Sequence, residues 1–140
     1  MLIVDTGPLV ALIDRRNPAL HAQCSAIVKR ENGLLFTTVS CLTEAMYFLR
    51  GLCGWKGQAI LWEYVRQSQL VVDAQIYPEL ARASRLMEQY KDTPMSLADA
   101  SLVALAEQRK IYRILTIDSD FHHYRINGKD SFEVINPAQP

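Results

Sequence analysis

The sequence lacks the features of several large protein classes. It has no run approaching the roughly 20 apolar residues of a membrane span, and its N-terminus, Met-Leu-Ile-Val-Asp, shows neither a basic segment nor an apolar stretch of signal length. It has no G-x-G-x-x-G motif, which argues against a dinucleotide-binding enzyme. We therefore expect a cytoplasmic protein.

The sequence also has few cysteines and a formal net charge of zero. The three cysteines have no C-x-x-C spacing, which argues against a disulfide framework or a structural zinc site, and we expect Cys24, Cys41 and Cys53 to be small buried side chains. Lys plus Arg and Asp plus Glu number 15 each, so one strongly basic DNA-binding face is not expected. A nucleic-acid enzyme remains open, because bound metal ions add positive charge where a phosphate binds.

The rest of the composition is that of an ordinary globular chain. The length of 140 residues fits one domain over 1–140, and 49% hydrophobic with 21% charged residues argues against disorder. Residues 136–140 are expected to form a loose tail.

Apolar periodicity predicts strands alternating with helices. Strands are expected at 2–4, 34–38, 70–72, 113–117 and 132–135. Helices are expected shortly after Pro8 and at 18–31, 40–51, 57–67, 77–90 and 96–110. This alternation predicts a parallel sheet with helices on both faces.

Acidic residues follow several of the predicted strands. Asp5 ends the first strand, Asp118 and Asp120 follow the fourth, and Glu44 and Asp99 lie in the first turns of two helices. Ligands of open α/β sheets bind outside the carboxyl ends of the strands, near a switch in strand order. We therefore expect these carboxylates to converge on one edge of the sheet.

Each acidic residue also has an ordinary structural interpretation. Asp99 follows Ser96 by three residues, the spacing of a capping box. Glu44 fits a solvated helix position, and Asp5 and Asp118 fit strand-end or turn positions. As a group they favour metal binding, because clustered carboxylates repel each other and a divalent cation removes that cost. Without a suitable cysteine or histidine nucleophile, the pattern points to metal-assisted hydrolysis.

Four segments together resemble one known family. They are Ile3-Val4-Asp5-Thr6-Gly7-Pro8-Leu9-Val10-Ala11-Leu12, Ser40-Cys41-Leu42-Thr43-Glu44-Ala45, residues 95–106 (MSLADASLVALA) and Thr116-Ile117-Asp118-Ser119-Asp120-Phe121. In this order and at this spacing they resemble the PIN-domain family, and within it the VapC-like toxins. The resemblance covers nearly the whole chain.

The resemblance implies a fold, a reaction and a site. The fold is a three-layer α/β/α sandwich with a central parallel sheet, and the reaction is Mg²⁺- or Mn²⁺-dependent endoribonuclease cleavage of RNA. The implied metal ligands, some acting through water, are Asp5, Glu44, Asp99 and Asp118. Thr6 and Thr116 would orient these ligands or their waters, and Asp120 and Asp92 are further candidates.

The resemblance also implies a small antitoxin protein that covers the site, and self-association as a dimer. An aromatic segment would suit such contacts or fill the core; its members are Tyr47, Phe48, Trp55, Leu61, Trp62 and Tyr64. Candidate phosphate contacts, each also consistent with a solvated charge, are Arg15, Arg16, Arg50 and Lys56. The histidines, candidate ligands or bases and equally surface residues, are His21, His122 and His123.

Two rival functions remain. One is a catalytically silent PIN-like RNA-binding or scaffold protein. The other is a phosphotransferase or receiver domain, for which Asp73 follows a strand as an acceptor would, but the other acids are not placed as a receiver requires. A haloacid-dehalogenase-type enzyme needs Asp-x-Asp after the first strand, and Asp5-Thr6-Gly7 stands there instead.

Overall fold

A five-stranded parallel sheet forms the centre of the protein. The computed structural model describes residues 1–32, 34–74 and 76–139. The strands pair in the order β3-β2-β1-β4-β7, and all four pairings are parallel. Their bounds are β1 (Leu2–Val4), β2 (Leu35–Thr38), β3 (Leu70–Asp73), β4 (Arg113–Leu115) and β7 (Glu133–Ile135).

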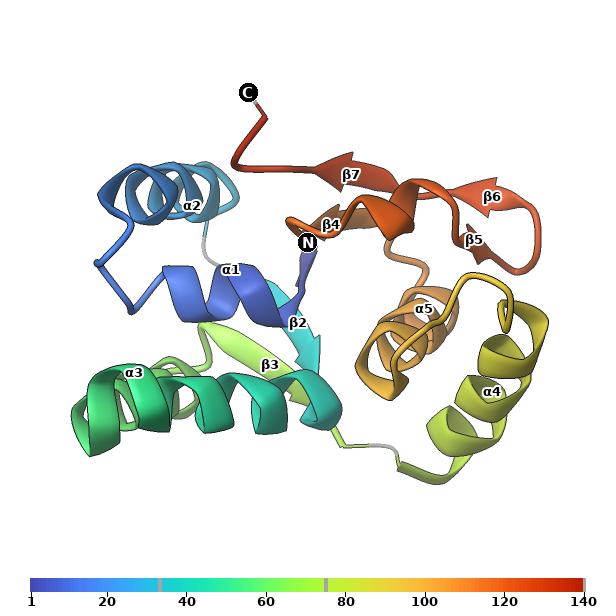
Figure 1. The fold of residues 1–140 in the computed structure, drawn as a ribbon, viewed down its shortest axis with the longest axis horizontal. Coiled ribbons are helices and arrows are strands. Elements are labelled where there is room, and N and C mark those ends of the chain that lie inside the picture. The colour runs from blue at the N-terminus through green and yellow to red at the C-terminus, as the bar shows by residue number, and fades with distance from the viewer. Residues whose placement is uncertain (33, 75, 140) are drawn as a thin grey trace.

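Helices cover both faces of this sheet, which confirms the predicted three-layer α/β/α sandwich (Figure 1). One face packs against α1 (Thr6–Ala11), α2 (Pro18–Arg30) and α3 (Val39–Arg66). The other packs against α4 (Ile76–Gln89) and α5 (Leu97–Arg109). The remaining elements are a short 3₁₀ helix η1 (Ser119–His122) and a hairpin of β5 (Arg125–Ile126) and β6 (Asp130–Ser131).

The alternation of side chains along β1 divides the core between the two faces. Leu2 and Val4 join the core on the side of α1–α3, whereas Ile3 joins the core around α5. All three are fully buried, which explains why the strand is a continuous apolar run.

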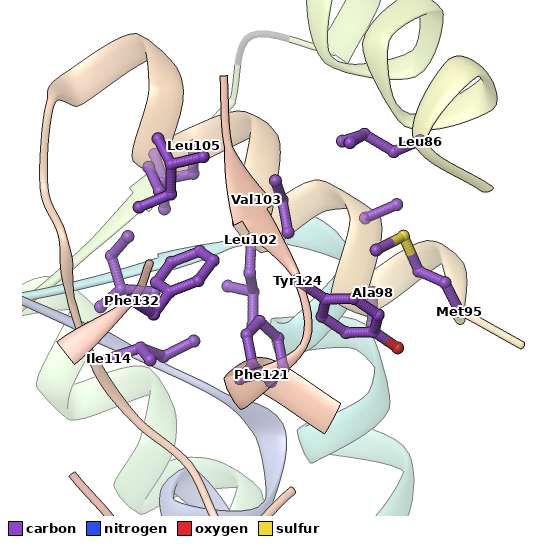
Figure 2. Packing of buried hydrophobic residues seen from close by; sticks show 14 of the residues in the cluster. Leu86, Met95, Ala98, Leu102, Val103, Leu105, Ile114, Phe121, Tyr124 and Phe132 are labelled. Carbon is purple, nitrogen blue, oxygen red and sulfur yellow. The ribbon is translucent and has the colours of Figure 1, made fainter. Parts of the chain in front are cut away.

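Helix α5 is buried on nearly all sides. Figure 2 shows its residues Leu102, Val103 and Leu105 among aromatic rings from the segment that follows β4. Those rings meet edge to face, with 5.2 Å between the centroids of Phe121 and Tyr124. The 3₁₀ helix η1 and the β5–β6 hairpin therefore cover the core around α5. This packing fixes the chain just after Asp118.

Some boundaries differ from the sequence predictions. The two helices expected at 40–51 and 57–67 are both present, because α3 consists of two helical parts that meet at a kink at Gly54, whose φ is 64°. A residue without a Cβ adopts this conformation readily, so the break falls there and the expected end at Gly51 is wrong. The fourth strand ends at Leu115 and not at 117, and η1 and the β5–β6 hairpin were not predicted.

The C-terminal residues 136–139 differ from the loose tail expected for 136–140. Asn136 Oδ1 accepts a hydrogen bond of 2.9 Å from the Ala138 amide, and Pro137 is buried. Position 140 lies outside the described residues. Within the part of the chain that the structure describes, no helix combines the length and apolarity needed to cross a membrane.

The burial of α5 predicts a strong effect of truncating its core. Replacing the fully buried Leu102 with Ala should lower the free energy of unfolding by about 2–5 kcal/mol, because it opens a cavity among well-packed neighbours. The matched control is Leu97→Ala on the same helix, where the side chain is 45% exposed and the loss should be about 0.5 kcal/mol. Denaturant unfolding measures both; equal losses would contradict this packing.

Candidate active site

The sheet changes its direction of growth between β1 and β4. From β1 the chain adds β2 and then β3 on one side, and it later adds β4 and β7 on the other side. The Asp5 amide, just past β1, donates a 3.0 Å hydrogen bond to the Leu115 carbonyl at the end of β4. This switch point opens a crevice between neighbouring strand ends, where ligands of open α/β sheets bind.

A cavity of about 570 Å³ lies at this place. Its lining residues are Asp5, Thr6, Gly7, Val10, Glu44, Phe48, Leu52, Ser96, Asp99, Ile117 and Asp118. The structure thus brings together the four acidic residues that the sequence selected, from β1, α3, α5 and the loop after β4.

Asp5 is the most firmly held of these acids. Its Oδ1 accepts from the Thr6 amide at 2.7 Å, and its Oδ2 accepts from the Thr116 hydroxyl at 2.7 Å. Thr116 Oγ1 in turn accepts from the Asp118 amide at 3.0 Å. One threonine therefore links the carboxylate after β1 to the backbone that carries Asp118.

Glu44 and Asp118 are each held through one oxygen. The Thr6 hydroxyl donates to Glu44 Oε1 at 2.8 Å, which connects the start of α1 to α3. The Asp120 amide donates to Asp118 Oδ1 at 2.9 Å, which starts η1. Among the described residues, no hydrogen bond reaches Glu44 Oε2 or Asp118 Oδ2, so each side chain retains an oxygen for a ligand.

Asp99 performs the capping duty that its spacing from Ser96 predicted. Its amide donates to Ser96 Oγ at 3.0 Å, and its Oδ2 accepts from the Ser96 amide at 3.2 Å. The capping box occupies one oxygen, and Asp99 still lines the cavity. Capping α5 and facing a ligand are therefore compatible roles for this residue.

Burial and neighbouring negative charges disfavour the charged forms of Asp5 and Asp99. Burial raises the pKa of Asp5 most, against the lowering effect of its bonds to Thr116 and Thr6, and the charges of Asp118 and Glu44 raise it further. Burial is also the main cause that raises the pKa of Asp99 to about 6, with the charges of Asp5 and Asp118 adding to it. A bound cation would relieve this repulsion.

The donor set fits a hard divalent cation that keeps part of its water. Within the described residues, no three His, Cys, Asp or Glu side chains are grouped closely enough to hold one ion. Mg²⁺ is commonly bound by one or two carboxylates, with waters and substrate phosphates completing its octahedron. Oxygens of Asp5, Glu44, Asp99 and Asp118 suit that mode, since some of them can act through water.

Other polar candidates from the sequence lie outside the cavity lining. Asp120 contributes its amide to Asp118, and Asp92 is exposed. Asp73 ends β3 at the edge of the sheet, away from the switch point. The basic residues proposed for phosphate contact are exposed and do not line the cavity; they are Arg15, Arg16, Arg50 and Lys56.

The histidines and aromatic residues take varied positions. His21 Nδ1 lies 2.9 Å from the Ala11 carbonyl at the end of α1, and His122 and His123 are exposed. Of the aromatic segment, Leu61 is buried in the core and Tyr64 is half-buried. The exposed members are Tyr47, Phe48, Trp55 and Trp62.

Two contacts near the site were not predicted from the sequence. Cys41, expected only as a small buried residue, has its Sγ 4.0 Å from Asp5 Oδ1, and burial raises the pKa of its thiol to about 12. Thr38 Oγ1 and Ser101 Oγ lie 2.7 Å apart in the buried interface that joins the starts of α3 and α5. Cys41 precedes Glu44 by less than one helical turn, but only the sheet topology brings Thr38 to Ser101.

The sheet order and the acidic cavity at its switch point define an α/β/α sandwich protein with a carboxylate site suited to a divalent cation. The chain belongs to the PIN domain family, whose family model matches residues 2–127.

Individual relatives agree with this membership. The chain is 28% identical over 136 residues to ribonuclease VapC26 of Mycobacterium tuberculosis, covering 96% of this chain and 99% of the relative. The crystal structure of M. tuberculosis VapC20, a toxin that cleaves the sarcin–ricin loop, superimposes with a TM-score of 0.78 at 18% identity, covering 86% and 92% of the two chains. A toxin–antitoxin complex from Klebsiella pneumoniae gives 0.67 at 19% identity, with 98% of each chain covered.

The raised pKa of Asp99 predicts a pH-dependent stability of the metal-free protein. An unfolded Asp99 ionises near 3.8 and the folded one near 6, so the folded state binds more protons between these values. The free energy of unfolding should therefore fall as the pH rises from about 4 to 6. Thermal unfolding in chelator measures this, and Asp99→Asn, which can still cap α5, should reduce the slope.

Asp130→Asn is the matched control, since Asp130 is exposed on β6 outside the cavity. It should leave the slope as in the wild type. A slope unchanged by Asp99→Asn, or a stability that rises over this range, would contradict the assignment.

Proposed function

We propose that this protein is a divalent-metal-dependent endoribonuclease and the toxin of a VapBC-type toxin–antitoxin pair. The observation that carries the proposal is the convergence of four carboxylates, from four separate elements, on one cavity at the switch point of a PIN-domain sheet. The ribonuclease and toxin descriptions of its relatives support the same reaction class. An RNA substrate also agrees with the cytoplasmic location expected from the sequence.

The proposed roles follow from how each side chain is held. Asp5, Asp99 and Asp118 would hold Mg²⁺ or Mn²⁺, and Glu44 would complete the cage or polarise the attacking water. The bound metal supplies positive charge that polarises the phosphodiester and lowers the pKa of a bound water. Thr6 fixes Glu44 Oε1 by its hydroxyl.

Thr116 has a comparable positioning role on the opposite side of the site. Its hydroxyl donates to Asp5 Oδ2 and accepts from the Asp118 amide, which fixes the positions of two proposed ligands relative to each other. The balanced net charge and the acidic cavity leave the metal as the main attraction for the phosphate.

Removing one negative charge from the site tests the proposed reaction. Asp5→Asn and Asp99→Asn should each reduce the rate of RNA cleavage at least 100-fold, or about 2.7 kcal/mol of transition-state stabilisation. The wild type should cleave with Mg²⁺ or Mn²⁺ and stop when chelator is added. A gel assay on single-stranded RNA measures the rates.

Asp130→Asn again serves as the control and should cleave at the wild-type rate, since it carries the same chemical change outside the cavity. Metal-dependent cleavage retained by both Asp5→Asn and Asp99→Asn would refute the site. A wild type that binds RNA without cleaving it would favour the silent RNA-binding alternative.

The proposed antitoxin requires a docking surface, and α3 offers one. Its exposed large apolar side chains are Tyr47, Phe48, Leu52, Trp55, Ile60 and Trp62. Trp55 is 66% exposed, and a tryptophan that remains exposed in the isolated chain is typical of an interaction site. We propose that Trp55, Ile60 and Trp62, which do not line the cavity, form the part of this surface that binds the antitoxin, and that α3 also contributes to the expected dimer.

Co-expression with the neighbouring small open reading frame tests this partner. The two products should co-purify, and Trp55→Ala should reduce the recovered antitoxin, because truncating a central aromatic anchor typically costs about 2 kcal/mol or more. Tyr112→Ala, which truncates an exposed aromatic residue away from α3, is the control. Recovery unaffected by Trp55→Ala would exclude this surface, and light scattering of the chain alone reports the dimer.

A further inference from the structure

The cavity that gathers the carboxylates has an unusual lining for a site that binds a polyanion. Among the described residues that line it, none is Lys, Arg or His. Besides the acids, its walls carry four apolar side chains, which are Val10, Phe48, Leu52 and Ile117. Within this cavity, contact with RNA beyond the metal-bound phosphate would therefore use chemistry other than positive charge.

Phe48 is the largest of these apolar side chains, and its place on α3 ties it to the acids. It follows Glu44 by four residues, so both lie on one face of the helix about 6 Å apart along its axis. Long side chains in a helix lean toward its N-terminus, which directs the Phe48 ring back over the turn that carries Glu44. The ring is 48% exposed, so it is available to a ligand.

Ile117, directly before Asp118, is a second apolar residue of the cavity lining. A Cβ on Gly7 would lie 2.9 Å from Ile117 Cδ1, so the missing side chain at position 7 is what allows Ile117 to pack at the cavity. The Ile117 side chain is nevertheless 44% exposed. The acids thus share the cavity with two apolar side chains, Phe48 and Ile117, that remain accessible to solvent.

We propose that Phe48 stacks on an unpaired nucleobase next to the scissile phosphate, with Leu52 and Ile117 extending the apolar contact. This inference rests on the proposed ribonuclease function and assigns to that site the residue that would contact the bases of an unpaired RNA segment. Base-paired RNA hides the faces of its bases, whereas single-stranded RNA offers them to aromatic side chains. The site then selects its substrate by stacking, and the metal holds the phosphate.

A nucleobase is favoured over an apolar protein side chain because the apolar walls belong to the cavity that holds the proposed metal ligands. A phosphodiester bound at the acids would place its flanking nucleotides next to these apolar side chains. Stacking of bases on aromatic side chains contributes substantially to the binding of single-stranded nucleic acid and does not depend on the base sequence.

The neighbouring aromatic residue offers a matched control. Tyr47 is 72% exposed and meets the Phe48 ring edge to face, with centroids 5.7 Å apart, but it does not line the cavity. Both side chains are exposed and both lie on α3, so their truncation to Ala should leave the fold intact. Thermal unfolding of each variant checks this.

The experiment compares the two truncations on a single-stranded oligoribonucleotide that carries 2-aminopurine. Phe48→Ala should raise KM roughly 10- to 100-fold and abolish the fluorescence quenching that accompanies stacking. Phe48→Trp should restore both, and Tyr47→Ala should behave as the wild type. The slope of log affinity against log salt should be shallow, because each phosphate neutralised by a cationic side chain would add about 0.7 to it.

The outcomes separate this inference from the proposed function. If the wild type cleaves RNA and Asp5→Asn does not, yet Phe48→Ala matches Tyr47→Ala in KM and quenching, stacking is refuted and the ribonuclease function stands. If Phe48→Ala weakens only the antitoxin complex, the apolar walls are a protein-docking surface and the inference is wrong. If the wild type neither cleaves RNA nor quenches 2-aminopurine, both proposals fail.

Discussion

The two hydrogen bonds of the Asp5 carboxylate are the constraint on which the rest of the site depends. One comes from the Thr6 amide at the start of α1 and the other from the Thr116 hydroxyl beyond β4, so a single side chain joins the two strands that flank the switch point. Thr6 also holds Glu44 through its hydroxyl, and Thr116 also holds the Asp118 amide. Burial and neighbouring charges oppose the ionised Asp5, while these bonds favour it. The fold thus fixes the position of Asp5 next to Glu44 and Asp118 despite the repulsion between them.

Much of the fold was predictable because buried parallel strands and amphipathic helices leave strong patterns. Leu2, Ile3 and Val4 are apolar because both faces of β1 are covered, and this is visible in the sequence alone. The break in α3 was misplaced because Gly51 and Gly54 are equivalent as residue types, and only the backbone torsion at Gly54 distinguishes them. The β5–β6 hairpin was missed because each strand has two residues, too few for an alternation to be recognised.

The candidate site was predictable to the extent that it consists of charged residues at the ends of strands. Asp5 and Asp118 follow directly from that rule, and the capping role of Asp99 was visible in its spacing from Ser96. Glu44 depended on the family resemblance, since its link to Thr6 joins elements 38 residues apart. The Thr38–Ser101 pair and the apolar wall at Phe48 depend on three-dimensional packing, for which a sequence carries no local pattern.

The left-handed torsion at Gly54 divides α3 into two parts with different duties. The part before it carries Glu44 and Phe48 and is fastened to α1 by Thr6. The part after it carries the exposed Ile60 and Trp62 and has its own helix direction. Glu44 is therefore held by a contact that does not involve the second part. In evolutionary terms, the exposed apolar surface beyond Gly54 can diverge while the residues of the cavity are inherited unchanged.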